Sequence, residues 1–173
     1  MRLLSVIALC LCAGTGAAQS VPDIKPGDTC EKLRGAYGKE TAQQGPAHIW
    51  KQNGVTIRVL VKPNGPCLAG LVEYSVESGH TYTTRDGVTL GRDTLAEAQR
   101  KLQGRIDANS YMSLRGEGKA YGQLVVSSAP ANPFKGTYSW QLRKSVADTP
   151  TNPPRITDFT TEPVIVYSIE APE

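Results

Sequence analysis

One pattern that occurs twice constrains the fold of this chain most strongly. Gly27-Asp28-Thr29-Cys30-Glu31-Lys32-Leu33-Arg34-Gly35-Ala36-Tyr37 has a counterpart in residues 91–102. In each copy a glycine and a capping Asp or Thr precede apolar residues at i, i+3 and i+7, the spacing of one face of a short helix. A constant offset relates the two triplets, which are Cys30, Leu33 and Tyr37, then Leu95, Ala98 and Leu102. The pattern predicts a repeated unit, with chance similarity between two capped helices as the alternative.

Both predicted helices begin with a capping signal. Thr94-Leu95-Ala96-Glu97 fits the capping box, in which the Thr hydroxyl and the Glu carboxylate bond N–H groups that the first turn leaves free. Asp28-Thr29-Cys30-Glu31 has the same spacing, with Asp28 as the predicted cap. We therefore expect two short helices that each bury one face.

Strand-like segments follow each predicted helix. Residues 48–52 lead through Asn53-Gly54 to residues 55–62, and Asn-Gly between two such runs is a strong hairpin signal. Residues 68–76 are expected to complete a three-stranded antiparallel meander. The second unit is expected to hold strands at 111–115, 119–127 and 137–143, an irregular Pro-rich crossing at 148–154 and a final strand at 163–170. That final strand is rich in apolar and β-branched residues, so we expect it to be paired within the fold.

These segments predict an α+β fold of two tandem units, each a short helix packed on an antiparallel β-meander. Residues 1–18 carry Arg2, an apolar run and small residues before Gln19, the layout of a cleavable secretory signal. The predicted organisation is therefore a signal peptide at 1–18, a first unit at 19–80 and a second unit at 81–173. The apolar run is shorter than the about 20 residues that a signal anchor would need to span a membrane. Lipid attachment is disfavoured because Cys10 and Cys12 each follow a Leu, so we expect a free periplasmic protein.

Removal of the signal leaves two cysteines, Cys30 and Cys67. An exported protein with an even cysteine count meets oxidising conditions, so we expect a Cys30–Cys67 disulfide, with a free reactive thiol as the alternative. His48 and His80 are the only histidines, and neither has ligand spacing from a cysteine, so we expect no metal and no cofactor. The formal net charge of +3 and the absence of a Lys/Arg run disfavour a nucleic-acid partner.

Motifs for catalysis are missing from the sequence. It contains no Gly-x-Ser-x-Gly elbow, no His-Glu-x-x-His and no phosphate loop. A histidine-based triad would have to use His48 or His80, and both are interpreted as solvated histidines. We therefore do not expect an enzyme; a small periplasmic hydrolase remains an alternative that would need one histidine to meet an acid and a nucleophile.

Candidate partner-binding residues are aromatic. Trp50, Tyr138 and Trp140 lie in predicted strands, where they could face a partner or, as the alternative, the core. Phe134 and Lys135 lie in a polar loop beside prolines, and Phe134 is the best single candidate for a contact residue. A Phe folded back onto the sheet is the alternative for that position.

The order of glycine, cap, short helix, Trp-bearing hairpin and strand resembles the SmpA/OmlA (BamE-like) family of outer-membrane assembly lipoproteins. Residues 27–38, Trp50, 55–61 and 68–76 carry the likeness in the first unit, and residues 91–102 carry it in the second. Two such units in one exported chain are similar to the β-lactamase inhibitor protein family, in which a concave sheet binds an enzyme. The resemblance implies an inhibitor or immunity protein against an envelope-acting enzyme or toxin. The alternative is an accessory of envelope assembly, although the chain lacks the lipidation cysteine of that family.

Overall fold

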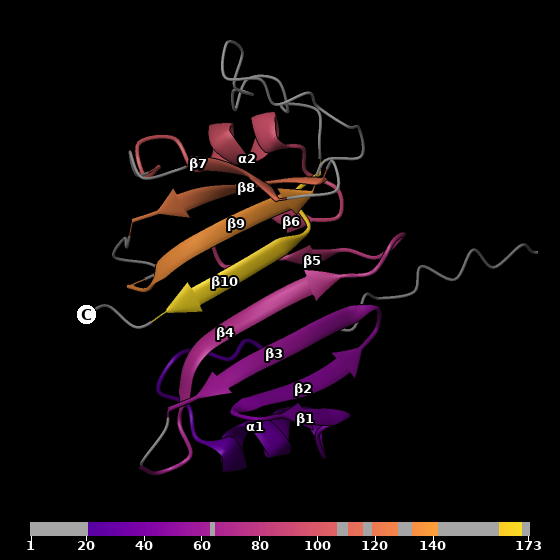
Figure 1. Ribbon diagram of the computed structural model, residues 1–173, viewed down its shortest axis with the longest axis vertical. Helices are drawn as coiled ribbons and strands as arrows, with labels where there is room; N and C mark the ends of the chain where they lie inside the picture. Colours follow the sequence, from indigo (N-terminus) through magenta and orange to yellow (C-terminus); the bar gives the residue numbers. More distant parts are fainter. Residues whose placement is uncertain are drawn as a thin grey trace, which may run out of the picture.

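The fold is built on one antiparallel sheet. The computed structural model describes residues 21–62, 65–106, 111–115, 119–127, 133–141 and 163–170. In that part of the chain eight strands form a sheet of order β1-β2-β3-β4-β10-β9-β8-β7, and a two-stranded ribbon, β5-β6, stands apart (Figure 1). The predicted signal peptide at 1–18 and the predicted crossing at 148–154 lie outside the described residues.

The first half begins with a helix and continues into four strands. These are α1 (Cys30–Tyr37), β1 (Ala42–Gln44), β2 (Ala47–Gln52), β3 (Val55–Val61) and β4 (Ala69–Val76). The cap of α1 is Thr29 rather than Asp28, because the Thr29 hydroxyl accepts the Lys32 N–H while the Asp28 carboxylate pairs with the Lys32 ammonium. The predicted hairpin turn is confirmed, since Asn53 and Gly54 both have positive φ between β2 and β3.

The second half has the same types of element in a less regular arrangement. It comprises β5 (Tyr82–Thr83), β6 (Thr89–Leu90), α2 (Leu95–Lys101), β7 (Tyr111–Arg115), β8 (Lys119–Val126), β9 (Lys135–Gln141) and β10 (Val166–Glu170). The predicted capping box is confirmed: the Thr94 hydroxyl accepts the Glu97 N–H, and the Glu97 carboxylate accepts the Thr94 N–H at 2.8 Å. Strand β9 starts at Lys135, two residues before the predicted start at residue 137, so Lys135 lies in the strand and not in the preceding loop.

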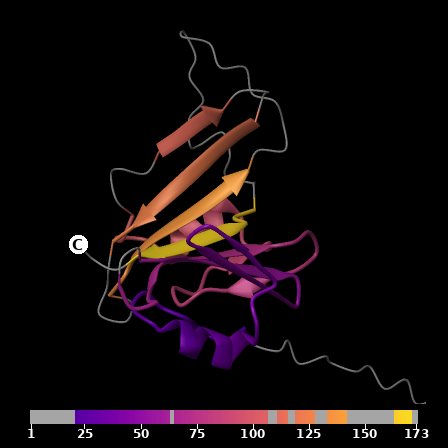
Figure 2. The same ribbon diagram turned by 60° about the horizontal axis from the view of Figure 1, so that its bottom comes forward.

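Strand β10 joins the two halves and overturns the predicted fold class. It is hydrogen-bonded to β4 on one side and to β9 on the other, which makes the sheet continuous from β1 to β7 (Figure 1). Figure 2 shows β10, in yellow, beside the orange β9. The fold is therefore mostly β, with two short helices in the described part, and not two tandem helix-on-meander units. The repeat in the sequence corresponds to two similar capped helices. It does not determine how strands that are distant in the sequence pair with one another. The expectation that the final strand pairs within the fold is confirmed.

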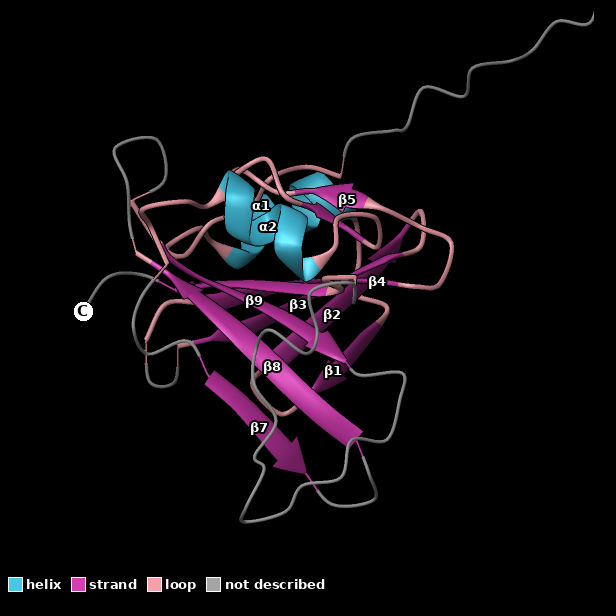
Figure 3. Ribbon diagram, turned by 90° about the horizontal axis from the view of Figure 1, so that it is seen from above, coloured by secondary structure: helices cyan, strands magenta, loops and turns pink. Residues whose placement is uncertain are grey.

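The covering elements all lie on one side of this sheet. Figure 3 shows α1, α2 and β5 on the same face, while the edge strands β1 and β7 lie further from the helices than the central strands do. The sheet therefore curves away from its helices. In the described residues no helix is long and apolar enough to cross a membrane.

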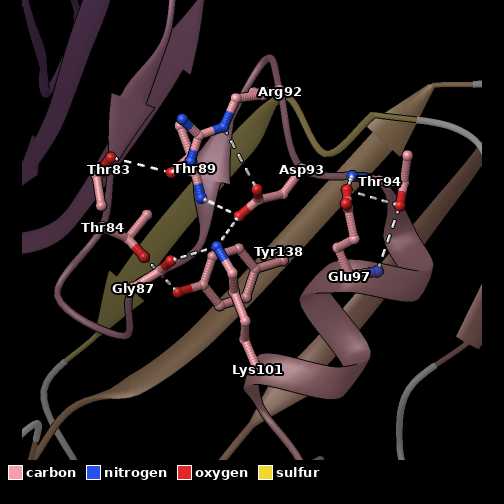
Figure 4. A network of polar contacts seen from close by, with 10 residues as sticks. All are labelled: Thr83, Thr84, Gly87, Thr89, Arg92, Asp93, Thr94, Glu97, Lys101 and Tyr138. Carbon is pink, nitrogen blue, oxygen red and sulfur yellow. Dashed lines mark hydrogen bonds and ion pairs between the residues drawn. The ribbon is translucent and has the colours of Figure 1, made fainter.

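A polar network fixes the β5–β6 ribbon between α2 and the sheet (Figure 4). The Asp93 carboxylate accepts the Thr89 N–H and the Lys101 ammonium, each at 2.6 Å. Burial alone would raise the pKa of Asp93, but these two hydrogen bonds together outweigh it and lower that pKa. The Thr84 hydroxyl lies 2.8 Å from the Tyr138 hydroxyl, so the ribbon is tied to β9 as well.

Candidate binding face of the sheet

Alternation along the strands gives the sheet a covered face and an open face. One row of directly paired residues crosses the covered face, under the helices, and every member is at most 1 % exposed. The row is Trp50, Ile57, Tyr74, Tyr167, Tyr138 and Leu124. Its rings stack where the strands pair, with centroids 4.6 Å apart between Tyr138 and Tyr167. This face is the core and cannot bind a partner without unfolding.

The open face is made by the alternate residues of the same strands. Figure 1 looks onto this face, with β5 and β6 behind the sheet. We define the open face as Ile49, Lys51, Thr56, Arg58, Leu60, Leu71, Glu73, Ser75, Gln123, Val125, Lys135, Thr137, Ser139, Val166, Ser168 and Glu170. All but Val125 are half-buried or exposed. The described covering elements lie on the other side, so they leave the open face accessible to a partner.

Short hydroxyl side chains occupy the centre of the open face. They are Thr56, Ser75, Ser168, Thr137 and Ser139, on the four neighbouring strands β3, β4, β10 and β9. Within the described part of the chain none of these five hydroxyls forms a hydrogen bond. Each therefore has both a donor and an acceptor to offer to another molecule.

Charged residues on the open face oppose one another in register. Arg58 lies directly across from Glu73, and Lys135 directly across from Glu170. Opposite charges in such cross-strand positions favour pairing of the strands and leave little net charge on the surface. The face therefore does not select a strongly charged partner.

Aliphatic side chains surround the hydroxyls. Leu60 and Leu71 are opposite one another on β3 and β4, and both are half-buried. Ile49 and Val166 are also half-buried, while Val125 is 8 % exposed. The open face therefore combines apolar area with hydroxyl groups that can form hydrogen bonds.

Two residues predicted to contact a partner lie in the core instead. Trp50 is 1 % exposed and its indole N–H donates to the Gly38 carbonyl at 3.0 Å. Tyr138 is fully buried, and its hydroxyl donates to the Asp86 carboxylate at 2.8 Å. The prediction that they contact a partner is wrong because their positions in β2 and β9 have the parity of the covered face. The alternative interpretation, that such strand aromatics belong to the core, is the correct one for both.

The remaining candidates have different outcomes. Phe134 is half-buried and packs against the core, with the Arg85 guanidinium carbon 5.9 Å from the ring centroid. This matches the alternative of a Phe folded back onto the fold, although part of the ring is accessible. Lys135 is exposed on the open face. Trp140 lies in β9 and pairs with Gly122 of β8, and its side chain is outside the described part of the structure.

The two histidines lie apart and in unlike surroundings. His48 is buried at 5 % exposure, contrary to the expectation of a solvated side chain, and its Nδ1 lies 2.9 Å from a Glu40 carboxylate oxygen. Hydrogen bonds from Arg34, the backbone and His48 lower the pKa of Glu40 to about 2. His80 is exposed, as expected, and its ring covers Gly54. Among the described residues no group of three or more His, Cys, Asp or Glu could hold a metal ion.

The predicted disulfide is confirmed. Cys30 and Cys67 are bonded, with Cα atoms 5.5 Å apart, and connect the start of α1 to the residues just before β4. The bond lies at one end of the sheet and fixes α1 over the covered face.

Comparison with known proteins found no matching family model, no matching curated protein and no matching solved structure.

Proposed function

We propose that this chain is an exported protein that binds a folded protein partner through its open face. One observation carries the proposal: α1, α2 and the β5–β6 ribbon all cover the same side, and the opposite side presents five hydroxyls that bond no other described residue. These hydroxyls are accessible to solvent, so they bond water in the free protein and can exchange that water for polar groups of a partner.

The dimensions of the open face favour a macromolecule over a small ligand. The six strands that carry the open face, spaced by about 4.8 Å and about six residues long, give a surface of roughly 24 by 20 Å. This area, on the order of 500 Å², corresponds to the smaller protein interfaces, which bury less than about 1,200 Å² in total over both partners. Small-molecule sites, in contrast, are concave pockets that enclose most of the ligand.

A rigid surface suits inhibition. The sheet is continuous, its helix α1 is held by a disulfide, and the ribbon is held by buried hydrogen bonds, so little conformational freedom would be lost on binding. An inhibitor or immunity protein blocks its target by shape alone and needs no chemistry of its own. We therefore propose as target an envelope-acting enzyme or toxin in the periplasm.

The test is capture of a partner from envelope extract by the mature chain, residues 19–173, followed by affinity measurements with two variants. Ser168→Arg places a long charged side chain at the centre of the open face, between Glu73 and Thr137. Ser78→Arg makes the same change in an exposed turn after β4 and serves as the matched control. We expect one stoichiometric soluble partner, at least a tenfold loss of affinity for Ser168→Arg, and an unchanged affinity for Ser78→Arg.

Equal affinities for the two variants would show that the partner does not use the open face. Capture of outer-membrane assembly factors instead of a soluble enzyme or toxin would contradict the inhibitor assignment and favour a role in envelope assembly. Both variants should keep the melting temperature of the parent protein, because both sites are accessible to solvent.

A further inference from the structure

Residues 21–27, which we call the N-terminal strap, cross the covered side of the molecule before α1. Ile24 is the anchor of the strap, since it is 1 % exposed and belongs to the hydrophobic core. Val21 also packs against that core, whereas Pro22, Asp23 and Lys25 are exposed. The strap therefore supplies a side chain that the core would otherwise lack.

Three side chains from distant elements bind the strap, and we call them its seat. The Tyr74 hydroxyl accepts the Ile24 N–H at 2.9 Å and donates to the Ile24 carbonyl at 3.1 Å. The Tyr37 hydroxyl donates to the Pro22 carbonyl, and Arg85 forms an ion pair with Asp23. Burial raises the pKa of Tyr74, which keeps its hydroxyl protonated and able to make both bonds.

This set of contacts resembles the recognition of a peptide. The two tyrosine hydroxyls bond only the main chain of the strap, the arginine selects a carboxylate, and the core accepts the aliphatic residue that follows it. Main-chain bonds that give affinity and side-chain pockets that give specificity are the usual division in peptide-binding sites. The seat therefore fits an extended segment with an acidic residue directly before an aliphatic one.

A short hinge connects the strap to the rest of the chain. A tight turn spans residues 25–28, where the Asp28 N–H donates to the Lys25 carbonyl at 3.1 Å and Gly27 has a φ of +89°. Pro26 and Gly27 occupy the two central positions of this turn, which are the positions that a type II turn favours for Pro and Gly. A copy in which this turn opens can place its strap in the seat of another copy, where the contacts of the seat are remade.

We propose that the seat binds the strap of a second copy of this chain, so that two copies exchange straps. Contacts in the seat are the same in the closed monomer and in the exchanged dimer. The equilibrium between these two forms therefore depends on the conformation of the hinge and on the protein concentration. A short connection gives the chain's own strap an effective concentration on the order of millimolar, so the parent protein is mainly closed at micromolar concentration. The exchanged dimer becomes the main species when the strap of one copy and the seat of the other copy are each weakened by substitution.

The test mixes two such variants of residues 19–173. Ile24→Ala weakens the strap and leaves the seat intact, whereas Tyr74→Phe with Arg85→Ala weakens the seat and leaves the strap intact. We expect each variant alone to sediment as a monomer and an equimolar mixture at about 100 µM to contain a heterodimer. The matched control is the seat variant that also carries Ile24→Ala, which should leave the mixture monomeric. A mixture that sediments like the control would overturn the proposal.

A second measurement decides the outcome if the seat variant does not fold. A synthetic peptide of residues 19–28 is added to the Ile24→Ala chain, and a peptide with Ala in place of Ile24 serves as the control. We expect the first peptide to raise the melting temperature in a saturable manner and the control peptide to do so at least tenfold more weakly. No shift with either peptide at 1 mM (roughly the effective concentration of a tethered strap) would also overturn the proposal.

Discussion

The Tyr138 hydroxyl contributes to stability through a buried polar network. Its hydroxyl donates to Asp86, whose side chain is 1 % exposed, and also lies 2.8 Å from the Thr84 hydroxyl. We predict that Tyr138→Phe lowers the free energy of unfolding by about 1–3 kcal/mol, because buried polar groups are left with fewer partners. Urea unfolding followed by circular dichroism measures this loss. A change below about 0.5 kcal/mol, the usual range of surface substitutions, would mean that the network contributes little to stability.

Glu40 gives the stability of the protein a dependence on acid pH. Hydrogen bonds from Arg34, the backbone and His48 lower its folded-state pKa to about 2, below the ordinary value of about 4.3 for an unfolded Glu. A lowered folded-state pKa means that the stabilisation is present above about pH 4 and is lost as the pH falls toward 2. We predict that Glu40→Gln is less stable than the parent at pH 6.

The same comparison at lower pH is the check on that prediction. The difference in melting temperature between Glu40→Gln and the parent should shrink steadily between pH 4 and pH 2. A difference that stays constant over this range would show that the Glu40 carboxylate is not responsible. The sequence analysis missed His48 in this cluster, because no local pattern around residue 48 indicates that the ring would be buried against Glu40.

At the scale of elements, the disulfide fixes α1 to the sheet. Cys30 and Cys67 are 37 residues apart, and the Cys30 N–H donates to the Cys67 carbonyl at 3.0 Å beside the bond. The chain-entropy model assigns a loop of this length about 4 kcal/mol. We predict that replacing both cysteines by Ala lowers the free energy of unfolding by about that amount, measured by chemical denaturation. Reductant should destabilise the parent and leave the double variant unchanged; equal sensitivity of the two would contradict this account.

Elements governed by local chemistry could be predicted from the sequence. The capping box of Thr94 and Glu97, the Asn53–Gly54 turn and the alternation of Val55, Ile57 and Val59 each depend on residues only a few positions apart. The structure confirms all three. Thr29 replaced Asp28 as the cap of α1 because Asp28 bonds the Lys25 N–H and the Lys32 ammonium instead.

The pairing of segments that are distant in the chain could not be predicted from the sequence. Nothing in residues 163–170 states that β10 inserts between β4 and β9, and this one insertion turns two expected meanders into one sheet. The same insertion aligns Tyr74, Tyr167 and Tyr138 in one buried row. Strand parity could show that Trp50 and Ile49 face opposite sides, but only the positions of the helices show which side is open.

For the whole molecule, the central consequence is an asymmetric sheet. One face buries the aromatic row beneath two helices, a ribbon and the N-terminal strap, and the other presents hydroxyl and aliphatic groups to solvent. The strap and its seat lie on the covered side, so exchange of straps between copies would leave the open face available. Partner binding and strap exchange can therefore be tested separately.

The most direct measurement is methyl NMR of residues 19–173 during titration with the partner captured from envelope extract. Methyl groups of Leu60, Leu71 and Val166 report on the open face, and those of Ile57, Val72 and Ile169 report on the covered face. We predict that the resonances of the first group shift or broaden on binding while those of the second stay in place. Perturbation confined to the second group, or to neither, would contradict the assignment of the open face as the binding surface.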